Sequence, residues 1–407
     1  MKLIRCFVPL CVVLLLVLGC SSHASHNGAA ANGLTKTATF EGGVLYTTSG
    51  GGGSGKFYVA SLAGSWEEMG RQYGGLLAGQ MADFYNVAVN GYFIGKQGAT
   101  YDQVLAGAQA MYAMYTPELA QLIDGTAETS GLGADKQKIM AALMGMIFGC
   151  SSMDAWGAYS ADGSMVTGRN WDTGSGKFDG FGGYLAAIVY KPNTAGAIPF
   201  VDVNYVGSLG MQNGMNAAGV FLDLQDGTMS DPGVFNQREP ACFRLVDFLQ
   251  QCSSLAAMDG PFSTTRPNLG LIINGSSAND ARVYEWSASY DTKIRLGDGL
   301  LAASNHYIDP SWQNLPPIGD GAPYGYTKER LANLLAMAEK YKGKIDPTVM
   351  MQIFDTAIPN GGPSFLNMPD FETYYHIVAA PAQLTLWLKA PGWSGWEKMD
   401  LRSLLTH

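Results

Sequence analysis

The hydrophobic pattern of this 407-residue chain changes its period at one point, the pair Gly149-Cys150. Before that pair, apolar residues recur at the spacing of amphipathic helices, and Ser65 with Glu68 forms a capping-box pattern at the start of the first of them. After it come short strand-like runs separated by Gly, Asp-Gly or Pro turns, such as SMVTGRN, GYLAAIVYK and IPFVDVNY. Helices and strands in separate blocks predict an α+β domain with largely antiparallel sheets.

Helical spacing returns in three segments of the second half: CFRLVDFLQQCSSLAAM (242–258), YTKERLANLLAMAEKY (326–341) and DPTVMMQIFDTA (346–357). The strand patterns LGLIING, ARVYEWSAS and GLLAASN lie between them, and YYHIVAAP and QLTLWLKA follow. We therefore expect one layered domain, to which residues 56–149 contribute a helical part and residues 150–407 the larger part.

The first residues have the layout of an export signal. Lys2 and Arg5 precede an apolar run of about a dozen residues that ends at Gly19-Cys20. This order resembles a bacterial lipobox, which predicts a lipoprotein signal peptide over 1–19 and lipid modification of Cys20. The protein is then expected in the cell envelope, attached to a membrane through the lipid alone, and to the outer membrane if the cell has one.

Residues 20–55 are rich in Gly and Ser, which predicts a flexible tether, with ATFEGGVLYT as a strand candidate inside it. The chain has a net charge of −9 and no basic stripe, which argues against nucleic acid as a partner. It contains no H-x-x-x-H, C-x-x-C or phosphate-loop pattern, so no metal and no organic cofactor is expected.

Three cysteines remain after the signal and the lipobox: Cys150, Cys242 and Cys252. If the segment between Cys242 and Cys252 is one continuous helix, they lie about 15 Å apart, too far for a disulfide. Both are therefore interpreted as core thiols. Cys150 is left as the thiol that needs an explanation.

A cysteine nucleophile needs a base. The histidines His306 and His376 could serve, as in a papain-like peptidase, but papain-type cysteines lie at helix N-termini, whereas Cys150 is expected to start a strand. Alternatively, cleavage of the Gly149–Cys150 bond would give Cys150 a free α-amino group, which titrates near pH 7.7–8.0 and can act as the base.

Six motifs in order resemble the cysteine branch of the N-terminal nucleophile hydrolases, above all the acyl-coenzyme A:6-aminopenicillanic acid acyltransferase group, with bile-salt hydrolase, penicillin V acylase and acid ceramidase as more distant relatives. The likeness runs from about Trp66 to Trp393. The motifs are LIDGTAETSGL (122–132), Gly149-Cys150-Ser151, TGRNWD (167–172), GMNAAGV (214–220), SNHY (304–307) and YTKERLANLL (326–335).

This resemblance implies a four-layer αββα sandwich formed from an autoproteolysed precursor. The expected products are a smaller chain that ends at Gly149 and a larger one that starts at Cys150. Cys150 would then be both the nucleophile and, through its α-amino group, the base.

The resemblance also implies roles for the TGRNWD cluster. Asp172 would hold the α-amino group of Cys150, and Arg169 would favour the thiolate, since a guanidinium stabilises a neighbouring negative charge. The alternative is a surface ion pair on a turn.

Three further site residues follow from the resemblance. Asn305 is expected to donate from its side chain to an oxyanion, Asn216 from its backbone N–H, and Arg330 to reach the site from a helix. The alternatives are a structural turn role for Asn216 and a solvent-facing position for Arg330.

Three large side chains near the motifs, Met153, Trp156 and Trp171, either line an acyl pocket or belong to the core. The expected activity is hydrolysis of a small-molecule N-acyl amide with an apolar acyl group, through a Cys150 thioester, or transfer of that acyl group to another amine. The rival hypotheses are the papain-like Cys-His peptidase and a non-enzymatic binding lipoprotein with a degenerate hydrolase fold.

Overall fold

The computed structural model describes residues 33–50, 55–143, 149–313, 315–318 and 324–406. The predicted signal peptide and Cys20 lie outside these residues. Within the described ranges, no helix is long and apolar enough to cross a membrane.

Two β-sheets form the centre of the molecule. The larger sheet, sheet A, has ten strands in the order β1 (Leu34–Phe40), β2 (Gly43–Thr48), β3 (Tyr58–Gly64), β6 (Leu185–Pro192), β7 (Phe200–Tyr205), β8 (Asn213–Asn216), β9 (Phe221–Asp226), β10 (Leu271–Ser276), β11 (Ala281–Trp286) and β12 (Lys293–Leu296). The smaller sheet, sheet B, has six strands in the order β13 (Leu300–Ala303), β4 (Gly149–Ala155), β5 (Val166–Gly174), β14 (Phe371–Ala380), β15 (Thr385–Lys389) and β16 (Glu397–Asp400).

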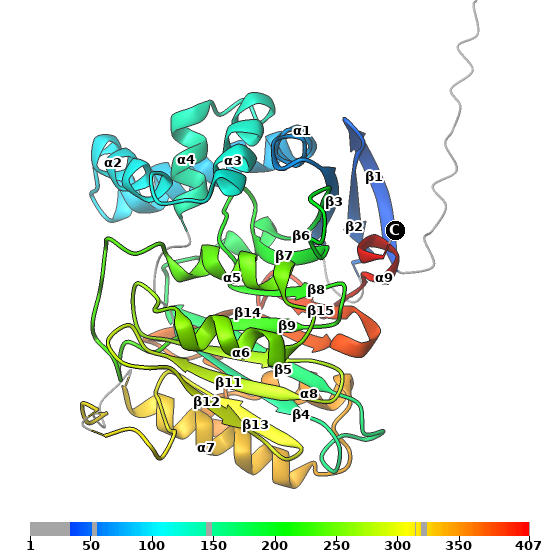
Figure 1. Ribbon diagram of the computed structural model, residues 1–407, viewed down its shortest axis with the longest axis vertical. Helices are drawn as coiled ribbons and strands as arrows, with labels where there is room; N and C mark the ends of the chain where they lie inside the picture. Colours follow the sequence, from blue (N-terminus) through cyan, green and yellow to red (C-terminus); the bar gives the residue numbers. More distant parts are fainter. Residues whose placement is uncertain (1–32, 51–54, 144–148, 314, 319–323, 407) are drawn as a thin grey trace, which may run out of the picture.

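The sheets lie face to face, with β9 against β4 and β11 against β13. Helices α5 (Ala241–Gln251) and α6 (Leu255–Thr264) pack on sheet A, while α7 (Tyr324–Lys340) and α8 (Pro347–Phe354) pack on sheet B (Figure 1). These are four layers in the order helix, sheet, sheet, helix. The predicted αββα sandwich is therefore confirmed.

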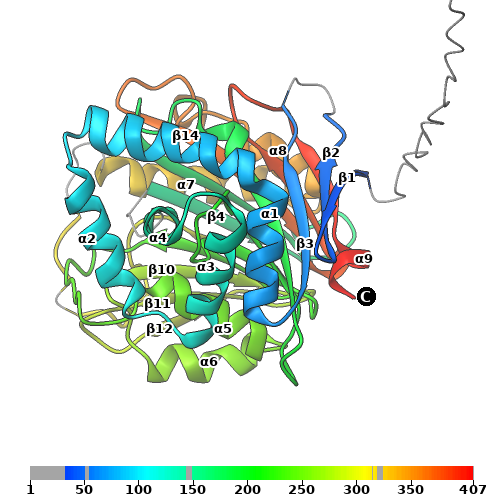
Figure 2. The same cartoon turned by 90° about the horizontal axis from the view of Figure 1, so that it is seen from above.

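The helical part of the first half forms a separate group, which lies at the top of Figure 1 and in front of the sheets in Figure 2. It consists of α1 (Trp66–Tyr85), the π-helix η1 (Asn86–Lys96), α2 (Tyr101–Tyr112), α3 (Pro117–Thr129) and α4 (Ala134–Ala142). Helix α1 begins at the predicted capping box, since the Ser65 side chain accepts from the Glu68 backbone N–H, and the Glu68 carboxylate accepts from that of Ser65. It packs on β2, β3 and β6.

The remaining helices are short: the 3-10 turns η2 (Phe181–Tyr184), η3 (Ile358–Asn360) and η4 (Pro381–Gln383), and α9 (Arg402–Leu405). Strand pairing is antiparallel except between β3 and β6, which are parallel. This parallel pair joins the two halves of the chain in one sheet.

Two sequence predictions are wrong in detail. The tether predicted over 20–55 contains β1 and β2, an antiparallel pair that extends sheet A through β3 and includes the strand candidate ATFEGGVLYT; Leu34 and Leu45 of this pair are buried. The single helix predicted over 242–258 is two helices, because α6 starts afresh where the Ser254 side chain accepts from the Ala257 backbone N–H.

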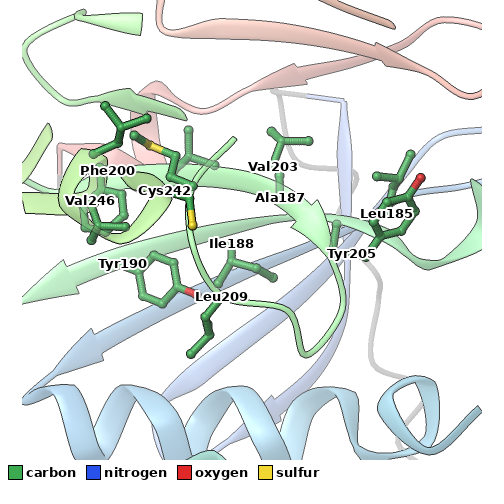
Figure 3. Close-up of a cluster of buried hydrophobic side chains, with 14 of the residues drawn as sticks. Leu185, Ala187, Ile188, Tyr190, Phe200, Val203, Tyr205, Leu209, Cys242 and Val246 are labelled. Atoms are coloured by element: carbon green, nitrogen blue, oxygen red, sulfur yellow. The ribbon is translucent and has the colours of Figure 1, made fainter. Parts of the chain in front are cut away.

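Cys242 and Cys252 are buried free thiols, as predicted. Figure 3 shows Cys242 among apolar side chains of β6, β7 and α5. The sulfur packs there as a small apolar group.

Candidate active site

Cys150 is the second residue of β4, which lies between β13 and β5 in sheet B. In the register of β4 with β5, Gly149 is opposite Asp172 and Cys150 is opposite Trp171. The Cys150 side chain is only 2% exposed. Because side chains alternate along a strand, Cys150 and Ser152 face sheet A, whereas Gly149 faces the helices on the other side.

Arg169 on β5 points to the thiol. Its Nη2 lies 3.3 Å from Cys150 Sγ and donates to the carbonyl oxygen of Leu224 at 2.9 Å. The guanidinium also lies over the Tyr375 ring, 5.4 Å from its centroid. Arg169 is fully buried, so the alternative of a surface ion pair is wrong.

Asn305 contacts the backbone nitrogen of Cys150, which in this continuous chain is a peptide amide. The Cys150 N–H donates to Asn305 Oδ1 at 2.9 Å, and Arg330 Nη2 donates to the same oxygen at 2.5 Å. Asn305 Nδ2 donates to the Asp226 carbonyl oxygen at 2.9 Å. The amide oxygen of Asn305 therefore holds the nitrogen, and its NH₂ group does not face the thiol as an oxyanion donor would.

Asp172 is paired with Arg330. Arg330 Nη1 donates to Asp172 Oδ2 at 2.8 Å, and Thr373 Oγ1 donates to Oδ1 at 2.5 Å. Arg330 is buried and its guanidinium lies 5.0 Å from the centroid of the Phe365 ring, so a solvent-facing arginine is excluded. Asp172 thus reaches the Cys150 nitrogen through Arg330 and the Asn305 oxygen rather than directly.

The electrostatics of the continuous chain favour a neutral thiol. Burial raises the pKa of Cys150 to about 12; Arg169 and Arg330 oppose this shift, and Asp172 and Asp223 add to it. Burial also raises the pKa of Asp172 to about 6, against the opposing effect of Arg330. At neutral pH the carboxyl is ionised and the thiol is protonated.

A cavity of about 160 Å³ opens beside the Gly149 end of β4 and not at the sulfur itself. It is lined by Gly149, Thr173, Gly174, Lys177, Asp226, Met229, Asn305, Arg330, Phe365 and Phe371. None of Met153, Trp156 and Trp171 lines it, and Met153 and Trp171 are core residues.

The predicted role of Asn216 is not supported. Its side chain donates to the carbonyl oxygens of Leu249 and Cys252 at the end of α5, and its backbone N–H donates to the Val220 carbonyl oxygen. Strand alternation explains this, because β8 directs Asn213 towards sheet B and therefore Asn216 towards α5. Asn216 has the turn-stabilising structural role that was the alternative.

Neither histidine contacts Cys150 among the described residues. The Nδ1 atom of His306 lies 2.9 Å from Thr327 Oγ1 and 3.2 Å from Ser304 Oγ. His376 is buried, and neither ring nitrogen has a hydrogen-bond partner in the described chain. Burial lowers the pKa of His306 to about 4 and that of His376 to about 3, which makes both weak bases. This arrangement disfavours a Cys-His pair.

Five residues of the site were missed by the sequence prediction. Thr373 supports Asp172, Tyr375 lies under Arg169, Thr327 accepts from the Asn305 backbone N–H at 2.9 Å, Asp226 accepts from the Asn305 side chain, and Asp223 is a buried carboxyl near the thiol. None of them lies beside a predicted nucleophile in sequence. Four of them lie on strands β9 and β14 and Thr327 lies on α7, so only the folded chain brings them to Cys150.

The described residues contain no group of three or more His, Cys, Asp or Glu side chains that could hold a metal ion. The hydrogen-bonding groups around Cys150 are amides, hydroxyls, guanidinium groups and carboxylates. Such a set can hold a nitrogen, stabilise a thiolate and orient an acyl group.

No protein-family model matches the chain, and a comparison with curated protein sequences gives no match. The structure is similar to that of a variant of conjugated bile acid hydrolase from Clostridium perfringens, with 13% identity, coverage of 62% of this chain and 93% of that chain, and a TM-score of 0.43.

It is also similar to a Caenorhabditis elegans orthologue of N-acylethanolamine-hydrolyzing acid amidase, with 14% identity, coverage of 57% of this chain and 93% of that chain, and a TM-score of 0.41. Penicillin V acylase from Agrobacterium tumefaciens is similar with 13% identity, coverage of 63% of this chain and 93% of that chain, and a TM-score of 0.40. At these identities and TM-scores, the activity of this chain is left to be proposed.

Proposed function

We propose that this protein is a self-processing cysteine amidase that cleaves small-molecule N-acyl amides through a thioester on Cys150. The observation that carries the proposal is the pair of contacts at Cys150, with Arg169 Nη2 3.3 Å from Sγ and Asn305 Oδ1 2.9 Å from the backbone nitrogen. One group favours the thiolate, and the other holds the nitrogen that becomes the α-amino group after cleavage.

Self-processing starts with attack of Cys150 Sγ on the Gly149 carbonyl carbon. The C–N bond of the Gly149–Cys150 peptide breaks, a thioester forms between Gly149 and Sγ, and the thiol proton passes to the departing nitrogen. Water then hydrolyses the thioester, which leaves a carboxylate on Gly149, a free thiol and a free α-amino group on Cys150. No cofactor is consumed.

In the mature enzyme the same atoms would act on a substrate. The α-amino group takes the thiol proton, Sγ attacks the amide carbonyl, the amine leaves with that proton, and water or a second amine accepts the acyl group. The cavity beside Gly149 supports an acyl subsite there, because Gly149 is the acyl group of the first thioester. Its lining residues Met229, Phe365 and Phe371 favour an apolar acyl chain.

The test is the intact mass of the purified full chain. We expect one fragment that ends at Gly149 and one that starts at Cys150, and Cys150→Ala is expected to stay uncleaved. Cys242→Ala, which removes a core thiol, is the matched control and is expected to be cleaved. An active protein with an unbroken Gly149–Cys150 bond would contradict the proposal.

The substrate class is then tested with the processed enzyme and a panel of N-acyl amides that differ in acyl length, each followed by release of the amine. Hydroxylamine added during turnover is expected to trap the acyl group as a hydroxamate. Trapping also separates a thioester route from direct attack by water.

A further inference from the structure

A layer of buried polar side chains lies between the two sheets, next to the pair of Arg169 and Cys150. Asp223 on β9 is fully buried and faces sheet B, because Gln225, two residues further along the same face, donates to Ser152 Oγ on β4. Ser152 is the cross-strand partner of Arg169. Asp223 therefore lies in the layer that holds the guanidinium.

The Asp223 carboxylate is held by neutral amides. Gln225 Nε2 donates to Oδ1 at 3.1 Å, and Asn274 Nδ2 donates to Oδ2 at 3.2 Å. Amides orient a carboxylate but do not neutralise it. Burial raises the pKa of Asp223 to about 6, with Arg169 as the largest opposing effect, so the carboxyl is ionised at neutral pH.

Arg169 in turn needs a counter-charge. Its Nη2 contacts Cys150 Sγ and the Leu224 carbonyl oxygen, while Nε and Nη1 have no hydrogen-bond partner in the described part of the chain. Asp172 is already paired with Arg330. A buried cation without a compensating charge is unfavourable, because burial removes its hydration and nothing replaces it.

We propose that Asp223 is the counter-ion of Arg169 and acts as a positioning residue for the Cys150 thiol. Its negative charge compensates the guanidinium, which donates to the carbonyl oxygen of Leu224, the residue that follows Asp223. The same negative charge opposes ionisation of the thiol, so Asp223 determines how strongly Arg169 favours the thiolate. The inference rests on the proposed function only in that the thiolate is the nucleophile.

The charged and titratable groups around the thiol come from four elements and are Arg169 and Asp172 on β5, Asp223 on β9, Arg330 on α7 and Tyr375 on β14. Around Asp223 they are Arg169 on β5 and Asp154 on β4. Since Asp172 and Arg330 neutralise each other, replacement of Asp223 changes the net charge that acts on the sulfur.

The test measures the rate of Cys150 alkylation by iodoacetamide as a function of pH, with the full chain and with Cys150 resolved by peptide mass. Asp223→Asn is expected to lower the midpoint of this profile by on the order of one pH unit, because a like charge near the thiolate is removed. Asp223→Ser is also expected to lower the midpoint. This second variant avoids placing an NH₂ group beside the donors of Asn274 and Gln225. Asp223→Glu restores the charge and is expected to stay near the unmodified protein.

The matched control is Asp154→Asn. Asp154 lies in the same layer, is fully buried and shares Asn274 as a donor, but it is not among the groups that shift the pKa of the Cys150 thiol. It is expected not to lower the midpoint. The inference is overturned if neither Asp223→Asn nor Asp223→Ser lowers the midpoint. It is also overturned if Asp154→Asn lowers the midpoint equally.

This test can fail independently of the proposed function. Chain cleavage, read from intact mass in the same samples, reports on self-processing. The alkylation midpoint reports on thiol ionisation and is compared between variants in the same state of cleavage, because cleavage places a free α-amino group beside the thiol.

Discussion

The Nη2 atom of Arg330 lies 2.5 Å from Asn305 Oδ1, the oxygen that also accepts the Cys150 backbone N–H. A guanidinium only donates, so this contact requires that the amide oxygen, and not the NH₂ group, faces the nitrogen of Cys150. Through its Nη1 atom Arg330 also binds Asp172. Arg330 thus connects the residue that contacts the nitrogen to the buried carboxylate.

This orientation predicts different effects for two replacements of Asn305. Asn305→Ala removes the acceptor and is expected to slow precursor cleavage by about 10-fold, the equivalent of ~1.4 kcal/mol for a buried donor left without its partner. Asn305→Asp keeps an oxygen beside the nitrogen and is expected to retain more activity than Asn305→Ala. Gel densitometry of precursor and products over time gives the rates.

The control for these variants is Asn193→Ala, at an exposed position. It is expected to be processed at the unmodified rate. Equal rates for the Ala and Asp variants at position 305 would show that the NH₂ group, as an oxyanion donor, is the functional part.

The buried pair of Asp172 and Arg330 predicts a large stability effect. Asp172→Asn leaves the Arg330 cation without a counter-charge and is expected to lower the free energy of unfolding by about 3 kcal/mol. Urea denaturation at pH 7 measures it. Asp291→Asn, in an ion pair where Asp291 is 87% exposed, serves as control and is expected to have little effect. A similar loss in both variants would contradict the expected importance of burial.

The carboxyl of Asp154 predicts a pH dependence of stability. Burial raises its pKa from an ordinary value near 3.8 to about 8, so between these values the folded state binds a proton that the unfolded state has released. The contribution of Asp154 to the free energy of unfolding therefore falls as pH rises from about 4 to about 8. Asp154→Asn is expected to flatten the profile by more than about 1.4 kcal/mol over this range, the equivalent of one pH unit. Urea titrations at pH 4, 6 and 8 test this, and an unchanged slope would contradict it.

The two histidines are predicted to be dispensable for cleavage. Neither contacts Cys150 in the described chain, and both have pKa values well below neutrality. His306→Gln and His376→Gln are expected to yield the same two fragments in intact-mass spectra. Circular dichroism controls for folding, since His376 is fully buried. A folded His306→Gln or His376→Gln chain that stays unprocessed would favour a Cys-His mechanism.

The sequence predicts attachment to the envelope through Cys20. We expect Cys20→Ala to move the protein from the membrane fraction to the soluble exported fraction, with Cys11→Ala as the control that leaves it in place. Fractionation and immunoblotting measure the distribution. An unchanged membrane fraction for Cys20→Ala would contradict the lipid anchor.

Local pattern in the sequence was sufficient for several features of the fold. The capping box of Ser65 and Glu68, the period change at Cys150 and the strand runs that follow depend on neighbouring residues, and each was found where it was expected. Arg169 and Asp172 both lie close to Cys150, as their positions in the sequence predicted, because β5 pairs with β4 as its antiparallel neighbour. The flexible tether was predicted over 20–55 with one strand candidate, ATFEGGVLYT, whereas 34–48 forms a strand pair; the segment 242–258 was predicted as one helix and is two. These differences arose where long-range pairing or one capping serine outweighed composition.

Tertiary structure alone decided which side chains meet the thiol. Asn216 and Asn305 were both predicted as oxyanion donors, but strand alternation directs the side chain of Asn216 to α5, and the arginine on α7 holds Asn305 against Cys150. Asp223, Thr373 and other missed residues enter through sheet register and sheet-to-sheet contact, which join residues far apart in the chain. The sequence therefore determined the elements and the nucleophile candidate, because these depend on local periodicity and spacing. The partners of that nucleophile depend on which faces are buried together, and only the folded chain decides that.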